Sequence, residues 1–272
     1  MSNTSTGDPG KPMEKPSEDL SEAMRQLSVT TYDSHETSGP FVVIREDFKK
    51  AAFDDLACTL KNPKLQLEEF SVHVSYYNEI EKNNNEIRNL LELLDHQLSV
   101  KKVDYLVFRP SCLLSILPFL KSGVLEKISL SFDYRAVDWS IDSTGMDQIA
   151  LLEQWKQAEE LELRTPFDKF PMEYATHFKR FEFDESFNMD RNKFIRIKNF
   201  LTKLDNFEQC NLSCLGSGFR RSISKLLGAS VSGNGWEKVF HHPIPDSDHY
   251  FEIKLTIFSF NLKITKKKRE IH

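Results

Sequence analysis

The sequence lacks the features that mark secreted and membrane-spanning proteins. Only four of its 272 residues are cysteines, and the longest apolar run, CLLSILPFL at 112–120, is interrupted by Ser115 and Pro118. That run is too short to cross a bilayer. Residues 1–20 contain no apolar stretch of the kind that signal peptides carry. We therefore expect no membrane partner and a reducing compartment, the cytoplasm or alternatively the nucleus, where the cysteines stay free.

An excess of basic charge is also missing. The formal net charge is −5 and the pI is about 5.9. A dedicated nucleic-acid binder needs a concentrated basic field, usually combined with aromatic residues. We therefore expect no nucleic-acid partner. The basic cluster KKKR at 266–269 is interpreted as a solvated C-terminal end, and a nuclear localisation signal is the alternative.

Recognisable catalytic motifs are absent as well. The glycine-containing segments GSG at 216–218 and SGNG at 232–235 complete neither a P-loop nor a dinucleotide-binding fingerprint. The sequence contains no G-x-S-x-G nucleophile motif. These absences predict a protein that is not an enzyme and that binds no cofactor.

One segment, HHPIPDSDH at 241–249, is rich in residues that could bind a metal. Adjacent histidines such as His241 and His242 point in different directions in most backbone conformations, and two prolines predict an irregular loop. The spaced histidines or cysteines of known zinc motifs are missing. We interpret the segment as a polar loop and expect no metal site. A metal-dependent enzyme that uses this loop is the alternative.

The composition divides the chain into three parts. Residues 1–40 are rich in Ser, Thr, Pro, Glu and Gly, and such a segment buries too little surface to offset the entropy of ordering. It is predicted to be a disordered polar tail. Residues 41–265 are predicted to form the folded domain, and residues 266–272 the basic end.

Six segments of the folded part share the pattern apolar-x-x-apolar-x-apolar. They begin 20 to 36 residues apart, and a helix or loop is predicted between each pair. Parallel strands need such crossovers, and this pattern is the strand core of leucine-rich repeats. The segments are LEEFSV, VDYLVF, LEKISL, AEELEL, FKRFEF and FEQCNL, which start at residues 67, 103, 125, 158, 178 and 207.

The predicted fold is therefore α/β: an irregular leucine-rich-repeat-like solenoid of parallel strands, with helices on the outer side and a β-rich C-terminal end. An open α/β sheet of the same strands is the alternative. In this reading Trp155 belongs to a crossover helix within 143–157 and anchors the core, and Cys210 is buried in its strand. Residues 249–265 are one long strand or a hairpin bent near Ser259.

Side chains in a strand alternate between two faces, so each segment also predicts which residues face away from the core. Most of the residues assigned to this inner face are polar or charged. They are Glu69, Ser71, His73, Tyr105, Val107, Arg109, Lys127, Ser129, Ser131, Glu160, Glu162, Arg164, Arg180, Glu182, Asp184, Gln209, Asn211 and Ser213.

Ten of these residues are the candidate partner-binding set: Tyr105, Val107, Arg109, Lys127, Glu160, Glu162, Arg164, Arg180, Glu182 and Asp184. Tyr105 and Val107 are candidate anchors, because apolar residues on an exposed sheet often mark interfaces. Alternatively a loop or the N-terminal tail covers them, or their strand is buried on both faces. The four carboxylates form an acidic strip that could steer a basic segment of a partner.

Several stretches resemble the nematode FTH domain, which usually follows an F-box in F-box A-type proteins. The most specific is LLEQWKQAEELEL at 151–163. It is supported in series by LKNPKLQLEEFSVHV at 60–74, LLSILPFLKSGVLEKISL at 113–130 and YFEIKLTIFSFNLKI at 250–264. The resemblance covers residues 41–265.

The resemblance implies a non-catalytic protein–protein interaction module that recruits targets to an F-box ubiquitin ligase. In F-box relatives the F-box docks on a Skp1-type adaptor. Residues 1–40 do not resemble an F-box, so we do not expect this chain to dock on the adaptor directly. A competitor that binds the targets of F-box relatives without ligase coupling is the alternative, and the protein target itself is unknown.

Overall fold

The computed structural model describes residues 26–31, 52–74, 80–107, 110–132, 143–164, 167, 170–184, 189–213, 223–234, 236–256 and 261–269. Its strands are β1 (Gln26–Thr31), β2 (Gln66–Val74), β3 (Ser99–Val107), β4 (Lys127–Phe132), β5 (Glu160–Arg164), β6 (Arg180–Asp184), β7 (Gln209–Ser213), β8 (Ser232–Gly233), β9 (Glu237–Pro243), β10 (His249–Thr256) and β11 (Asn261–Lys268).

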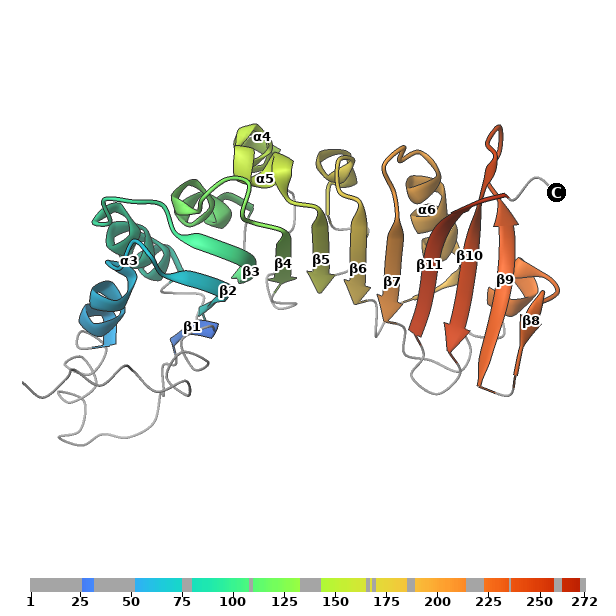
Figure 1. Ribbon diagram of the computed structural model, residues 1–272, viewed down its shortest axis with the longest axis horizontal. Coiled ribbons are helices and arrows are strands. Elements are labelled where there is room, and N and C mark those ends of the chain that lie inside the picture. The colour runs from blue at the N-terminus through green and yellow to red at the C-terminus, as the bar shows by residue number, and fades with distance from the viewer. Residues whose placement is uncertain are drawn as a thin grey trace, which may run out of the picture.

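Within the described residues, these strands form a single 11-stranded sheet in the order β1-β2-β3-β4-β5-β6-β7-β11-β10-β9-β8. Strands β1 to β7 pair in parallel with their neighbours in chain order. The pairs β7–β11, β11–β10, β10–β9 and β9–β8 are antiparallel. Figure 1 shows the result as one continuous row of strands, with the antiparallel group at its C-terminal end.

Helices fill the crossovers between the parallel strands, as strand-to-parallel-strand connections require. The α-helices are α3 (Ile80–Glu92), α4 (Ser143–Leu151), α5 (Glu153–Gln157) and α6 (Arg191–Thr202), and residues 52–60 and 223–227 are also helical. Short 3-10 helices are η2 (Pro110–Ser115), η3 (Leu117–Phe119) and η5 (Met172–Ala175). The mixed α/β class predicted from the sequence is confirmed.

Local sequence signals set several helix ends. The Asp190 side chain accepts a hydrogen bond from the backbone N–H of Lys193 at 2.7 Å and caps α6. Gly123 has a φ of +79°, which suits the turn between η3 and β4. Gly145 lets α4 lie close to η2, since a Cβ there would sit 2.9 Å from the backbone N of Ser111.

The core consists of two rows of apolar residues that run across the sheet, each row joining residues paired in register on neighbouring strands. One row is Phe70, Val103, Ile128, Leu161, Phe181, Cys210, Ile264, Ile253 and Phe240. The other is Val72, Tyr105, Leu130, Leu163, Phe183, Leu212, Leu262 and Leu255. All of these side chains are buried, and apolar residues of α3, α4, α5 and α6 join the same core.

Trp155 is the largest fully buried side chain of this core, as the sequence predicts. Its indole N–H donates a hydrogen bond to the carbonyl of Tyr174 at 3.0 Å, and its ring meets Phe178 edge-on at 5.1 Å between centroids. The segment predicted as one helix is broken into α4 and α5, because Leu152 has the extended dihedral angles of −69° and 135°. The break turns the short helix α5 so that Trp155 enters the core just before β5.

Both ends of the described chain differ from the predicted domain limits. Strand β1 lies inside the segment predicted as a disordered tail, and it pairs in parallel with β2. The rest of residues 1–40 lies outside the described residues. At the other end, β11 continues to Lys268, so the cluster at 266–268 extends the strand and does not follow it. Of the two alternatives for residues 249–265, the structure agrees with the hairpin: β10 and β11 are separate strands that pair antiparallel. Ser259 lies outside the described residues.

Among the described residues, no helix is long and apolar enough to span a membrane.

Candidate functional site

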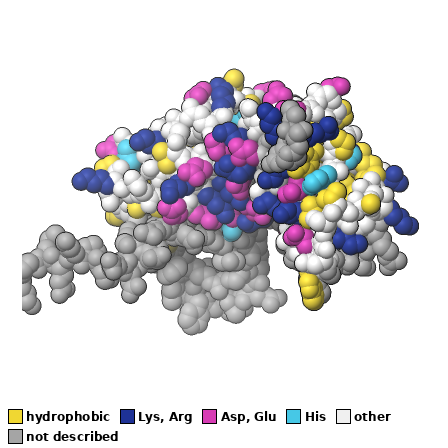
Figure 2. All heavy atoms as spheres, turned by 45° about the vertical axis from the view of Figure 1, so that its right-hand side comes forward, with side chains coloured by type: hydrophobic (Ala, Val, Ile, Leu, Met, Phe, Trp, Pro, Cys, Tyr) yellow, Lys and Arg dark blue, Asp and Glu magenta, His cyan; other side chains and the backbone are white. Residues whose placement is uncertain are grey.

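The sheet face opposite the core, called the open face here, carries two polar rows. The row through Asp104, called the Asp104 row, contains Ser71, Asp104, Ser129, Glu162, Glu182, Asn211, Lys263 and Lys254. The row through Lys127, called the Lys127 row, contains Glu69, Lys102, Lys127, Glu160, Arg180, Gln209, Thr265 and Glu252. Acidic and basic side chains are interspersed in a band across this face (Figure 2).

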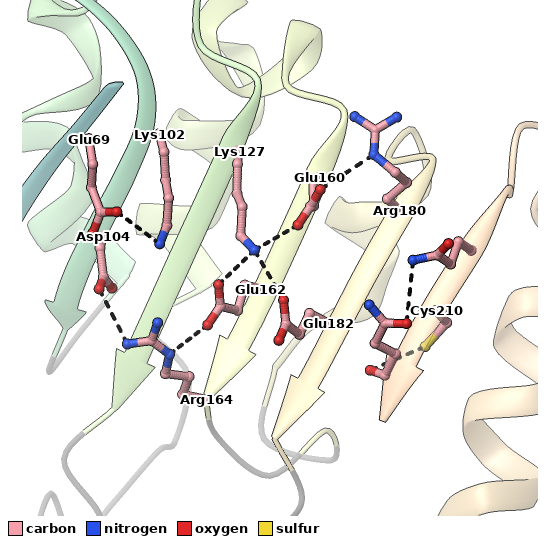
Figure 3. Close-up of polar contacts among 12 residues, drawn as sticks. Glu69, Lys102, Asp104, Lys127, Glu160, Glu162, Arg164, Arg180, Glu182 and Cys210 are labelled. Atoms are coloured by element: carbon pink, nitrogen blue, oxygen red, sulfur yellow. Dashed lines mark hydrogen bonds and ion pairs between the residues drawn. The ribbon is translucent and has the colours of Figure 1, made fainter. Parts of the chain in front are cut away.

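Lys127 is the centre of the charge network on the open face. Its Nζ lies 2.7 Å from Glu160 Oε1, 2.9 Å from Glu162 Oε2 and 3.1 Å from Glu182 Oε2. The three carboxylates come from β5 and β6, so a single ammonium group on β4 connects three strands (Figure 3).

Arg164 forms a second junction in the network. Its Nε donates to Glu162 Oε1 at 2.6 Å, and its Nη1 donates to Asp104 Oδ2 at 3.2 Å. His73 Nε2 lies 3.7 Å from the same Asp104 oxygen. Because Asp104 belongs to β3 and Arg164 to the end of β5, the pair bridges across β4 (Figure 3).

Further ion pairs extend the network to both sides. Lys102 Nζ donates to Glu69 Oε2 at 3.2 Å. The Arg180 guanidinium contacts Glu160 at 3.4 Å, Glu159 at 3.1 Å and Glu208 at 3.4 Å. The network therefore runs without interruption from β4 to β6, joins β3 through Arg164, and has a separate pair between β2 and β3.

The two most buried carboxylates of the open face remain charged because of this network. Burial alone raises the pKa of Asp104, but His73 and Arg164 outweigh it and lower the pKa below the ordinary value. Burial likewise raises the pKa of Glu162, and Lys127 and Arg164 reverse the shift. For Lys127, burial lowers the pKa, and Glu160, Glu162 and Glu182 together raise it well above that of a free lysine.

Seven of the ten predicted partner-binding residues lie on the open face. Six of them belong to the network described above: Lys127, Glu160, Glu162, Arg164, Arg180 and Glu182. Asp184, exposed at the end of β6, is the seventh. Val107 ends β3 in register with Phe132, and Arg109 lies outside the described residues.

The placement of Tyr105 on the open face is wrong. Tyr105 is fully buried in the core, where its hydroxyl donates to Asn84 Oδ1 and lies 3.3 Å from Ser115 Oγ. The apolar-x-x-apolar-x-apolar pattern in β3 begins at Val100 and not at Val103. A shift of three residues is odd, so it exchanges the two faces of the strand.

The same shift hid two residues of the open face, Lys102 and Asp104. The segment VKKVDY at 100–105 fits the pattern as well as VDYLVF does. A strand that starts the pattern at Val100 has Lys102 and Asp104 on the face away from the core. This placement of charged residues is the sequence signal that distinguishes the correct phase of β3. Leu106 is the fourth, apolar position of VDYLVF, and the pattern therefore assigns it to the core. In the structure it is half-buried and pairs with Ser131 in the register of the open face.

The segment at 241–249 is ordered differently from the predicted irregular loop. His241 and His242 belong to β9, and a tight turn containing Asp246 at φ 54° leads into β10. His242 Nε2 lies 2.9 Å from Lys198 Nζ, while His241 faces Glu252 at 3.9 Å. Among the described residues, no group of three or more His, Cys, Asp or Glu side chains is arranged to hold a metal ion.

Residues 81–226, more than half of the chain, match the family model of the FTH domain. The chain belongs to the FTH domain family. The match confirms the resemblance seen in LLEQWKQAEELEL, which forms parts of α4, α5 and β5. No curated protein and no solved structure matched the chain.

The part of the FTH domain that matches the family model contains most of the charge network. Strands β3 to β7 lie within residues 81–226, whereas β2 and β9 to β11 lie outside them. The predicted limits of 41–265 for the FTH domain remain a prediction beyond the matched residues.

Proposed function

We propose that this FTH-family chain is a non-catalytic interaction module that binds a protein target on its open face. The single observation that carries the proposal is the band of ion-paired side chains spread over five neighbouring strands, β2 to β6. The described helices pack on the other face of the sheet. A face of this kind offers a partner many fixed charges and polar atoms at once.

Mutual ion pairing prepares such a face for binding. Lys127 and Arg164 each contact at least two carboxylates, so their side chains have already lost rotamer freedom before a partner arrives. Binding therefore has a smaller entropic cost, because these side chains are already ordered in the free chain. Complementary charges mainly contribute specificity and association rate, which suits a module that selects targets.

We also infer that the parallel half of the sheet corresponds to an irregular leucine-rich-repeat-like solenoid. Support comes from strands β1 to β7, which follow one another in chain order and pair in parallel. Each strand from β2 to β7 adds one residue to each apolar row of the core. A quasi-repetitive architecture of this kind presents an extended surface, which is the use that solenoid proteins make of it.

Neutralising two accessible carboxylates tests the proposal. Glu182 is 38% exposed and Asp184 is exposed. E182Q/D184N therefore alters the open face; it removes the Lys127–Glu182 pair and leaves the pairs of Lys127 with Glu160 and Glu162 in place. We expect proximity labelling in cells to lose most of the wild-type partner set. For a purified target, the apparent affinity should fall roughly tenfold.

The matched control is E173Q/D205N, which removes the same charge from exposed positions outside the open face. Both double variants should stay folded, and E182Q/D184N should lose no more than about 1 kcal/mol of stability for its exposed ion pair. A partner set unchanged by E182Q/D184N, with the fold intact, would remove the open face from the proposal. Equal losses in the two variants would mean that net charge and not this face governs capture.

Ligase coupling is tested separately with a purified Skp1-type adaptor. We propose that the chain binds its target without docking on the adaptor directly, so a pull-down should recover the target and not the adaptor. Recovery of the adaptor by the isolated chain would contradict this part and would favour a complete ligase subunit. If the chain binds its target but not the adaptor, two roles are possible: recruitment of the target through another subunit, or competition with F-box relatives. The half-life of the target in cells separates them, because recruitment shortens it and competition lengthens it.

A further inference from the structure

The charges of the Asp104 row change sign along the sheet. Its charged residues on the parallel strands are acidic, namely Asp104, Glu162 and Glu182. Asn211 on β7 is neutral, and the next two residues, Lys263 on β11 and Lys254 on β10, are basic. Lys127 and Arg164 form ion pairs with the acidic residues of the row. Within the part of the chain that the structure describes, the two lysines have no comparable set of carboxylates beside them.

Lys254 and Lys263 lie directly opposite each other in the antiparallel pair β10–β11. Like charges in this arrangement destabilise a sheet. Lys254 Nζ reaches Glu252 Oε1 only at 3.8 Å, and the other oxygen of that carboxylate lies 3.9 Å from His241. Lys263 is exposed and forms no ion pair with any residue that the structure describes.

Other side chains near the pair do not remove the conflict. Exposed Lys267 lies on the same strand and the same face as Lys263, two face positions further along, which adds positive charge. Asn211 pairs with Lys263 on the other side and supplies an amide that can donate a hydrogen bond. The described part of this corner therefore holds three lysines and two carboxylates, Glu252 and Glu237 of β9. Glu237 lies opposite Thr256, diagonal to Lys254, and forms no ion pair with any residue that the structure describes.

We propose that Lys254, Lys263 and Asn211 bind an acidic side chain, Asp or Glu, from an extended segment of the protein target. The Cα atoms of directly opposed residues in an antiparallel pair are about 5 Å apart. One carboxylate between the two side chains therefore contacts both ammonium groups and relieves their repulsion. The Asn211 amide donates to the same carboxylate. This inference rests on the proposed function, since it assigns a target chemistry to the open face.

The binding test uses the full chain and a short fluorescein-labelled peptide with glutamates in a Ser/Gly background. Matched peptides carry Gln or Lys in place of Glu, and fluorescence anisotropy is followed at several salt concentrations. We expect the Glu peptide to bind more tightly than the Gln peptide, and the Lys peptide to bind weakest at this corner. K254Q/K263Q should lower the affinity for the Glu peptide roughly tenfold.

The control K203Q/K225Q removes the same charge from exposed lysines outside the open face, one after α6 and one in the helix at 223–227. It should leave the affinity for the Glu peptide unchanged. Equal binding of the Glu and Gln peptides, or an equal loss in the control, would overturn the proposal. So would a concentration-dependent dimer that K254Q/K263Q abolishes, because the occupant would then be a second copy of the chain.

A stability measurement checks the premise of repulsion without any ligand. K263Q alone should raise the urea midpoint slightly, because it removes one of the two opposed charges. A lower midpoint would mean that Lys263 is already compensated, and the proposal would lose its basis. Capture of targets that depends on Glu182 and Asp184 but not on Lys254 and Lys263 would refute this inference and leave the proposed function standing.

Discussion

Lys127 shows how much of the open face depends on one side chain. Among the described ion pairs, no other cation contacts Glu162 and Glu182 at the same time, and the Lys127 ammonium group also contacts Glu160. Arg164 contacts Glu162 but not Glu182. Glu162 is 6% exposed, so water screens its charge poorly. Removing one partner of such an arrangement leaves carboxylates facing one another with less compensation.

We therefore expect K127M to destabilise the chain by about 2 kcal/mol, within the range for leaving a buried charged group unsatisfied. Urea denaturation followed by circular dichroism measures the change.

The matched control for this variant is K101M. Lys101 Nζ pairs with Glu68 at 2.9 Å across β2 and β3, but both side chains are about half exposed. Exposed pairs contribute roughly 0 to 1 kcal/mol. Equal costs for K127M and K101M would contradict the central role assigned to Lys127.

At the scale of an element, β3 illustrates how pairing decides which face of a strand is buried. Both Tyr105 and Leu106 could occupy the core by polarity alone. Tyr105 lies between Val72 and Leu130 in register and finds polar partners in Asn84 of α3 and Ser115 of η2. The alternative phase would place Asp104 in the apolar core, where an unpaired carboxylate is costly.

Y105F should consequently destabilise the chain by about 1–2 kcal/mol, because it leaves Asn84 and Ser115 with one buried hydrogen-bond partner fewer. The set of captured partners should not change, since Tyr105 is not on the open face. Chemical denaturation and proximity labelling measure the two effects.

Y174F serves as the control, because the Tyr174 hydroxyl contacts Asp147 Oδ1 at 2.5 Å in an exposed position. It should cost little. A partner set altered by Y105F in a fully folded protein would contradict the buried placement.

At the scale of the whole molecule, the charge network makes stability dependent on pH. The folded chain lowers the pKa of Asp104 and of Glu162, mainly through Arg164, His73 and Lys127 acting against burial. A carboxyl with a lowered folded pKa contributes its full stability above its unfolded pKa, about 4. That contribution is lost as the pH falls through the folded pKa.

We expect the urea midpoint to fall steeply below about pH 4.5 as these carboxyls become protonated. E162Q should be less stable than wild type at pH 7 and should show a shallower acid dependence. E173Q should keep the wild-type profile. An E162Q profile parallel to wild type would mean that Glu162 is not stabilised by its neighbours.

His177 makes the stability of the chain depend on pH in a second range, above that of the carboxyls. Burial lowers its pKa, while a hydrogen bond to the Trp155 carbonyl at 2.7 Å acts in the opposite direction. The unfolded chain then binds a proton before the folded chain does, so stability declines as the pH falls below about 6.5. H177Q should make this earlier decline smaller and leave the one caused by the carboxyls, and urea midpoints measured between pH 5 and 8 show the difference. Part of the decline should persist, because burial and Lys198 also lower the pKa of His242.

The sequence alone determined the α/β class, the positions of β2, β4, β5, β6 and β7, the buried roles of Trp155 and Cys210, and the FTH family. These properties follow from local alternation, from short connections and from one specific motif, all of which are readable without knowledge of distant contacts. Six of the network residues were found in the same way, because their strands have a clear apolar face.

Only the tertiary structure decided the phase of β3, the strand β1, and the meeting of Lys254 with Lys263. A strand with apolar residues at both odd and even positions can turn either face toward the core. The face that is buried is the one whose residues continue the apolar rows of the neighbouring strands. The opposed lysines come from two strands of a hairpin whose register no local pattern fixes. Which charges compensate one another is a property of pairing, and pairing is settled by the whole sheet.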